Sequence, residues 1–303
     1  MASPIVRNNM TGTLEPILYT VFEAWKEFAR NEKMFPKVFN MASSAKNQET
    51  IQNLTGFALF SAKTEGASIA SDSYRQAQQT VIAHTTYAKK FAITREQIED
   101  AQYDAAVKDA GEMAVAAKET QEVLAWNTFN NAFAAGTTGG DGVALCSTAH
   151  PLYGTSGGTE SNRLAVDSDL TVTTLQTMIN DIEDTRDNQN LRIWLKPKYL
   201  LGPSQLKWTI GEILTSANKP YTPNRERNVM QDEGLQPLIV RYLTDPDAWF
   251  VCSEKNGLLW FDRRPVDFGR DTVFDSENMC YKSTFRVGQG WMDWRGVNGT
   301  PGA

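Results

Sequence analysis

A cysteine and a histidine, Cys146 and His150, lie four residues apart in the segment LCSTAHP. On one face of a helix, a thiol and an imidazole could serve as nucleophile and general base, provided that a third group orients the imidazole. Pro151 and the surrounding glycines favour a loop instead, and no third group is evident. The only other histidine, His84, lies in a strand-like segment. The pattern therefore predicts a structural loop and no catalytic residue.

Metal and cofactor sites are equally poorly supported. Zinc commonly takes four Cys or His ligands in closely spaced pairs, but Cys252 and Cys280 stand apart from Cys146. Three cysteines are too few for a disulfide framework and suit a reducing compartment. The runs GTTGGDG and GTSGG lack the spacing of a phosphate-binding or dinucleotide-binding loop. We expect a flexible, turn-rich connection here, and neither a metal nor a cofactor.

Composition excludes several classes of protein. The chain has 303 residues and a formal net charge of −6, with no basic stripe of the kind that nucleic-acid-binding proteins use to neutralise phosphates. The sequence therefore argues against specific binding of DNA or RNA. The start resembles no signal peptide, and no apolar run approaches the roughly 20 residues of a membrane span. We expect a protein that is made in the cytosol and does not cross a membrane.

The first half of the chain predicts three elements. Residues 13–30 read as an amphipathic helix with Leu18 and Phe22 on its apolar face, which could pack on its own subunit or on a neighbour. Residues 53–93 read as two strands of a long hairpin with too few large apolar side chains near its middle to bury much surface. A single helix is predicted over residues 94–135, about 60 Å long, opened by a Thr94 capping box and ended before Gly136.

The second half predicts a mixture of helices and strands. After the glycine-rich loop, a helix capped by Ser168 or Asp169 precedes a buried strand in 191–203 and a helix over 204–217. Four further strands are predicted, over 237–243, 248–254, 257–264 and 280–296. An Asn-Gly pair at Asn256 predicts a hairpin turn between the second and third of these. The fold class is therefore α+β.

Several motifs resemble a known family. The segments FAITREQIEDAQYD, DGVALCSTAHPLYGTSGGTESNRL, KPKYLLGPSQLKWTIGEIL, YLTDPDAWFVCS and YKSTFRVGQGWMDWRGVNGTPGA are similar to tailed-bacteriophage major capsid proteins of the Hong Kong 97 fold, in particular to Mu-like head subunits. The resemblance runs from about residue 50 to the C-terminus. Its most specific parts are D-G-x-x-L-x-S-T-x-H-P and G-W-x-D-W-R-G.

The resemblance implies a division of the chain into the parts of that fold. These are an N-terminal arm with a helix, an extended β-hairpin loop lying over a neighbouring subunit, a peripheral domain with a long spine helix and the glycine-rich connection, an axial domain around the symmetry axis, and C-terminal strands returning to the peripheral domain. The corresponding ranges are 1–52, 53–93, 94–164, 165–250 and 251–303.

The resemblance also implies a function and partners. The chain would self-assemble into pentameric and hexameric capsomers of an icosahedral head, and would contact packaged double-stranded DNA weakly and without sequence specificity. Portal, scaffold and decoration proteins would be further partners, and the scaffold is expected to be a separate protein. Some relatives crosslink covalently through a loop lysine; Lys63 lies in the corresponding region, but the sequence reveals no partner, so no crosslink is predicted. The alternatives are an encapsulin-type compartment and a cytosolic hydrolase using Cys146.

Overall fold

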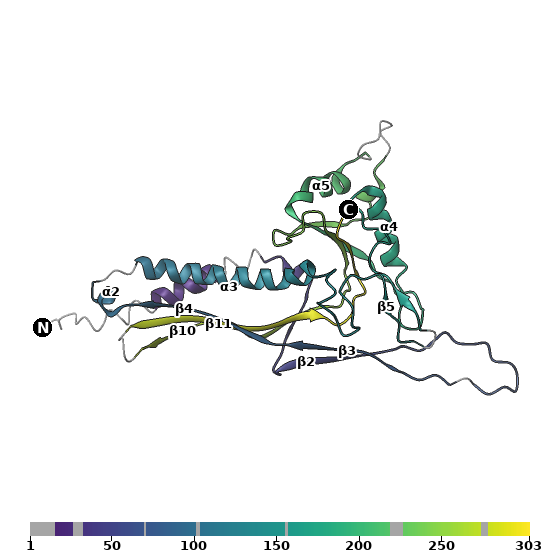
Figure 1. The fold of residues 1–303 in the computed structure, drawn as a ribbon, viewed down its shortest axis with the longest axis horizontal. Coiled ribbons are helices and arrows are strands. Elements are labelled where there is room, and N and C mark those ends of the chain that lie inside the picture. The colour runs from purple at the N-terminus through teal and green to yellow at the C-terminus, as the bar shows by residue number, and fades with distance from the viewer. Residues whose placement is uncertain are drawn as a thin grey trace.

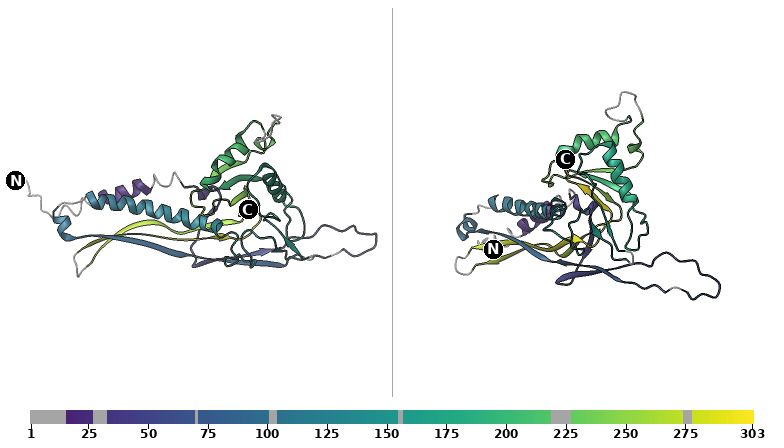
Figure 2. Two further views of the ribbon diagram at one scale, coloured as in Figure 1. Left: turned by 45° about the horizontal axis from the view of Figure 1, so that its top comes forward. Right: turned by 45° about the vertical axis from the view of Figure 1, so that its right-hand side comes forward.

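The chain forms a long body, from which a smaller unit rises near one end and a narrow hairpin projects (Figure 1). The same three parts are recognisable in two further orientations (Figure 2). The structure is a computed structural model that describes residues 16–26, 33–69, 71–100, 104–154, 157–218, 227–273 and 278–303.

The body is built on a long, twisted sheet with the strand order β1-β10-β11-β4. Strand β10 pairs antiparallel with β11, β11 pairs antiparallel with β4, and the short β1 runs parallel to β10. Inward-facing side chains such as Tyr281 and Phe285 alternate along β11 with more exposed ones. The strands are β1 (Asn40–Ser43), β4 (Thr85–Ile93), β10 (Leu258–Thr272) and β11 (Met279–Trp291).

A long helix, α3 (Asp104–Asn130), lies along this sheet and contacts β4 and β11 (Figure 1). The predicted single helix over 94–135 is wrong in two respects. The expected Thr94 capping box is present, but it opens the short helix α2 (Arg95–Glu99), which ends at Asp100. Helix α3 ends at Asn130, because the chain then turns and the Ala132 carbonyl accepts a hydrogen bond from the Cys146 amide at 2.8 Å.

Residues 16–26 form the described part of the predicted N-terminal helix, whose residues 13–15 and 27–30 lie outside the described ranges. The sequence left open whether this helix packs on its own subunit. Leu18 and Phe22 are fully buried in a cluster with the first half of α3, and Phe22 stacks on Phe268 at 4.5 Å between ring centroids. The helix therefore packs on its own subunit.

The rising unit contains a second sheet with the order β12-β9-β7-β8. Helices α4 and α5 cover one face, where residues such as Leu175, Ile210 and Trp249 form a core. The other face turns toward α3. The elements of this unit are α4 (Val172–Glu183), β7 (Pro197–Gly202), η2 (Ser204–Leu206), α5 (Lys207–Thr215), η3 (Val229–Gln231), β8 (Gln236–Ile239), β9 (Trp249–Ser253) and β12 (Val297–Thr300).

Two details of this unit differ from the prediction. Helix α4 is capped by Thr171, not by Ser168 or Asp169, because Thr171 and Thr174 form a reciprocal capping box. The buried strand in 191–203 is confined to β7, and Trp194, three residues before it, is 97% exposed. Apolar composition alone misplaced this tryptophan in the core.

The Asn-Gly pair at Asn256 joins two sheets and is not a hairpin turn. Strand β9 pairs with β7 and β12, whereas β10 pairs with β1 and β11. The Asn256 side chain donates to the Val38 carbonyl at 3.0 Å and accepts from the Leu258 amide at 3.1 Å. Gly257 is required by a close approach, since a Cβ atom there would lie 2.7 Å from the Asp293 nitrogen. The predicted turn is therefore a crossing point between sheets.

One apolar cluster joins the two sheets. Trp126 and Phe129 of α3 contact a core that includes Phe250 from β9 and Trp260 from β10. The boundary predicted at 250/251 thus runs through a continuous core and not through a linker. The α+β class is confirmed; the division into named domains stays a prediction.

The projecting hairpin is formed by β2 (Gln48–Leu54) and β3 (Gln76–Ala83), which pair antiparallel. The predicted hairpin over 53–93 is therefore shifted: its first strand begins at Gln48, and β4 belongs to the body. His84 alone separates β3 from β4. The remaining elements are η1 (Phe35–Lys37), β5 (His150–Pro151) and β6 (Thr159–Glu160).

Candidate functional site

Cys146 is not placed to act as a nucleophile. Its side chain is 1% exposed and belongs to the core shared by the two sheets. Burial raises the pKa of the thiol far above its usual range, so the reactive thiolate is disfavoured. Cys252, on β9, lies in the same core, and burial raises its pKa as well. Both residues are small core side chains in this arrangement.

His150 has the third group that the sequence did not reveal. Its Nδ1 lies 2.7 Å from Asp141 Oδ2, and its ring stacks on Trp294 with 4.3 Å between centroids. Nε2, which would face a nucleophile in a catalytic triad, instead lies 3.0 Å from Asn162 Oδ1. The residues around His150 therefore form a buried cluster in which both ring nitrogens lie beside side-chain oxygens of the same chain.

Asn162 holds this cluster to the rest of the chain. Its Nδ2 donates to the carbonyls of Leu145 and Val297, both at 2.7 Å, and its Oδ1 accepts from the Ser147 amide at 2.8 Å. Because all of these groups are buried or partly buried, each bond satisfies an atom that water cannot reach. One amide side chain thus links the glycine-rich loop to β12. Nothing in the spacing of Asp141, His150 and Asn162 marked them as partners.

Part of the glycine-rich loop packs closely against neighbouring elements. Gly140 packs against β3, where a Cβ atom would lie 2.6 Å from the Gln79 carbonyl oxygen. A Cβ atom at Gly139 would likewise come too close to the Trp291 indole. These glycines permit close packing of backbone against neighbouring groups, which is a different use of glycine from mobility.

Within the described ranges, no three His, Cys, Asp or Glu side chains gather closely enough to hold a metal ion. In the same part of the chain, no helix combines the length and apolar composition required to cross a membrane.

The tip of the hairpin, residues 57–74, exposes apolar side chains. Leu59, Phe60 and Ile69 lie almost entirely in solvent, and Phe57 is about half exposed although it packs on Tyr74 at 4.4 Å between centroids. Isolated apolar side chains on a surface are ordinary, but a group of them on a projection with no core of its own marks a contact surface. Lys63 lies within this tip and is exposed.

The base of the hairpin is fixed to the body. Asn53 Nδ2 donates to the Met292 carbonyl at 2.8 Å, and Gln189 Nε2 donates to the Gly56 carbonyl at 2.9 Å. Thr55 is fully buried, and its hydroxyl accepts from the Arg75 amide at 3.0 Å. The hairpin therefore leaves the body in a defined direction, while its tip extends beyond it (Figure 2).

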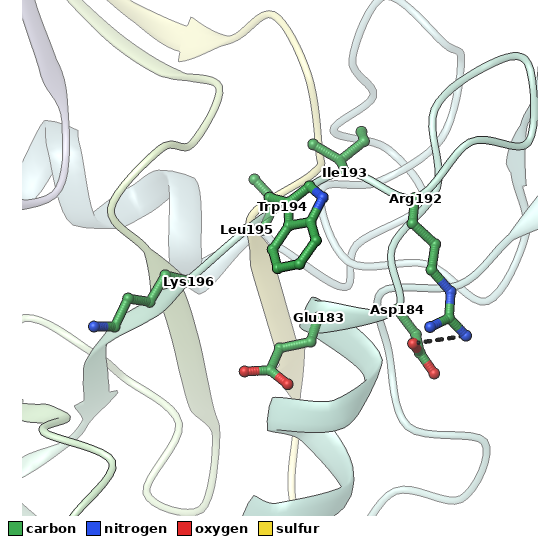
Figure 3. A pocket seen from close by; sticks show the side chains of 7 residues that line it. All are labelled: Glu183, Asp184, Arg192, Ile193, Trp194, Leu195 and Lys196. Atoms are coloured by element: carbon green, nitrogen blue, oxygen red, sulfur yellow. Dashed lines mark ion pairs between the residues drawn. The ribbon is translucent and has the colours of Figure 1, made fainter.

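A second exposed surface surrounds Trp194, between the end of α4 and the start of β7 (Figure 3). The indole lines a groove of about 490 Å³, together with Ile193 and four charged side chains, Glu183, Asp184, Arg192 and Lys196. Asp184 and Arg192 pair with each other at 3.0 Å. The sequence placed this tryptophan in a buried strand and so missed the surface.

A protein-family model described as phage capsid protein matches residues 77–297, which is more than two thirds of the chain. The chain belongs to the phage capsid protein family.

Solved structures agree in fold. The capsid of cyanophage P-SCSP1u matches with a TM-score of 0.61 at 11% identity, over 89% of this capsid protein and 88% of that chain. The procapsid of bacteriophage JBD30 matches with a TM-score of 0.54 at 14% identity, over 99% of this capsid protein and 76% of that chain. A virus-like particle from Pyrococcus furiosus matches with a TM-score of 0.56 at 10% identity, over 93% of this capsid protein and 98% of that chain. No curated protein matches in sequence.

The three matches establish the Hong Kong 97 type of fold, and the family model identifies the capsid protein as a shell subunit of a virion. The Mu-like affiliation expected from the motifs stays a prediction. Fold similarity extends to a particle from an archaeon, so the family model, and not the fold, distinguishes a phage capsid from other shells.

Proposed function

We propose that this chain is the major subunit of an icosahedral phage head and encloses double-stranded DNA. The observation that carries the proposal is the combination of a phage capsid family match with a projecting hairpin whose apolar tip has no core of its own. A subunit that repeats many times in a shell needs surfaces that are complementary to other copies of itself.

In this proposal the hairpin tip of one copy lies on the body of a neighbour. The contact is heterologous, because the tip and its receiving surface are different parts of the chain, and such contacts close into rings when the rotation permits. Pentamers and hexamers would then tile the head. The base anchors at Asn53 and Gln189 support this role, since a fixed direction lowers the entropy lost on docking.

The charge of the chain suits the proposed content of the shell. A net charge of −6 would leave DNA without strong sequence-independent attachment, which would otherwise resist loading and release. Portal, scaffold and decoration proteins are proposed partners, and the JBD30 capsid is a neighbour that is decorated with minor capsid protein trimers. We place synthesis in the host bacterial cytoplasm.

The axial and peripheral division is also part of the proposal. The unit with α4 and α5 would be the axial domain near the capsomer axis, and α3 would be the spine helix of the peripheral domain. The buried state of Cys146 disfavours the hydrolase alternative, and the family match disfavours the encapsulin alternative. No crosslink at Lys63 is proposed.

Electron microscopy of the purified chain, expressed with and without the neighbouring phage genes, tests the proposal. The expected result is closed icosahedral particles, which protect DNA from nuclease when they are isolated from infected cells. A chain that stays monomeric in every preparation would overturn the proposal. Particles that contain protein cargo and no DNA would establish the encapsulin alternative instead.

A further inference from the structure

Two tryptophans of the unit with α4 and α5 lie in solvent. Trp194 is 97% exposed and Trp208 is 75% exposed. An indole is a large apolar surface that commonly becomes buried at interfaces, where tryptophan is among the residues that contribute most to binding. Two such side chains on one small unit indicate two contact surfaces.

Each surface holds a charge that lacks an ion-pair partner within the described ranges of its own copy. Beside Trp194 in the groove, Asp184 pairs with Arg192, but Glu183 has no hydrogen-bond or ion-pair partner among the described residues (Figure 3). Lys196 also lines the groove, and after Lys198 it contributes to lowering the pKa of Glu254. Beside the other tryptophan, the Lys207 ammonium lies 5.0 Å from the Trp208 ring centroid and pairs with no acid in the described part of the chain. One surface is therefore an indole with an unpaired carboxylate, and the other an indole with an unpaired ammonium.

The surfaces lie at opposite edges of the same sheet. Helix α4, which ends at Glu183, contacts β12, β9 and β7, whereas α5, which begins at Lys207, contacts β7 and β8. In the sheet order β12-β9-β7-β8, α4 therefore lies toward the β12 edge and α5 toward the β8 edge. Figure 1 shows α4 and α5 on opposite sides of the unit. The two surfaces therefore face away from each other within one copy.

We propose that the Trp194 groove of one copy receives the Lys207–Trp208 corner of α5 from the next copy around a capsomer. This inference rests on the proposed function, and it names the partner as a second copy of this chain. Complementary patches on opposite sides of one unit form a heterologous contact, which repeats around a ring until it closes. Burial of the indoles supplies affinity, and the pairing of Glu183 with Lys207 fixes the register.

Crosslinking of assembled shells tests the contact. In a Cys280→Ser background, which removes the one thiol that is not fully buried, we would compare Trp194→Cys, Trp208→Cys and the double variant after a short bis-maleimide treatment. The double variant is expected to give a ladder that ends at five and six chains, and each single variant only monomers. Dimers from the Trp194→Cys variant would reveal a two-fold contact and overturn the proposal, as would monomers from the double variant.

Charge reversal provides a second measurement. Glu183→Lys and Lys207→Glu are each expected to lower the yield of closed shells about tenfold, and the double reversal to restore it, because the pair is recreated with the charges exchanged. Glu233→Lys, an exposed acid outside the groove, is the matched control and is expected to assemble normally. Equal losses in the control, or no recovery in the double variant, would refute the contact.

The two proposals fail in different ways. If the unaltered chain forms no shells in any preparation, with or without the neighbouring phage genes, the proposed function is wrong. If the unaltered chain forms shells, but the double cysteine variant gives no ladder, the function stands and only this contact is wrong.

Discussion

The hairpin tip, residues 57–74, and the glycine-rich loop, residues 136–164, look alike in sequence but differ in what they bury. Both are rich in small residues, and their described parts contain little regular structure. In the loop, His150 and Asn162 are buried and hydrogen-bonded within the chain. In the tip, Phe60 is completely exposed.

The difference concerns where each segment finds its partners. The loop satisfies its polar groups inside its own subunit, which fixes its conformation. The tip leaves apolar side chains in water, so its partners must come from elsewhere. Variants of the loop should therefore alter the stability of the subunit, whereas variants of the tip should alter assembly.

The largest loss of stability is expected from Asn162→Ala. The change leaves the Leu145 and Val297 carbonyls and the Ser147 amide without their partner, at about 1–3 kcal/mol for each group that becomes buried and unsatisfied. We expect a total loss of roughly 3–5 kcal/mol in denaturant unfolding. Asn131→Ala is the control, because the exposed Asn131 side chain donates a hydrogen bond to the Asn127 carbonyl alone among the described residues. Equal stability of the two variants would contradict the assigned role of Asn162.

A smaller loss is expected from Cys146→Ser. A hydroxyl in the core shared by the two sheets loses its hydrogen bonds to water, at a cost of about 1–3 kcal/mol. Cys280→Ser, at a half-buried position on β11, should cost less. The same two variants also address catalysis: hydrolytic activity that disappears only in Cys146→Ser, with stability unchanged, would contradict the buried structural role.

The free energy of unfolding should depend weakly on pH through His84, which lies at the junction between hairpin and body. Burial lowers the pKa of His84 below 6.5, Arg286 and Arg263 lower it further, and Glu49 raises it. Because the unfolded chain then binds protons more readily than the folded chain, the free energy of unfolding should decrease as the pH falls below about 7. His84→Gln should flatten this dependence in unfolding measured between pH 8 and 5. An unchanged slope in the variant would assign the pH response to other groups.

The smallest effect on stability, and the largest on assembly, is expected from Phe60→Ser. A fully exposed ring contributes little to folding, so unfolding should change by less than about 0.5 kcal/mol. Shell yield should nevertheless fall, as measured by electron microscopy and sedimentation. Val166→Ser, an exposed apolar residue outside the tip, is the control. Normal shells from Phe60→Ser would show that the tip and the loop do not differ as described.

Local patterns in the sequence predicted much of this fold. The α+β class, the apolar face of the N-terminal helix and the Thr94 capping box follow from residue spacing and hydrogen bonding between near neighbours. The motifs identified the family correctly. These features depend on residues that are close in the sequence, which is why they could be predicted.

The errors concern contacts between distant residues. Asn256-Gly257 has the composition of a hairpin turn, but the pairing of β9 with β7 makes it a crossing between sheets. Trp194 has the composition of a core residue, but its strand begins only at Pro197. The pairing of His150 with Asp141 and Asn162 depends on how the loop folds back on itself. Sequence spacing contains no information about these positions.

The exposed tip also limits how long a free subunit can persist. Before a neighbour covers them, Leu59, Phe60 and Ile69 remain available to any apolar surface in the cell. Unassembled chain should therefore accumulate only up to a modest concentration before it aggregates. Rapid capture by growing shells, or by a protein that shields the tip, would then determine how much of the synthesised chain becomes useful product.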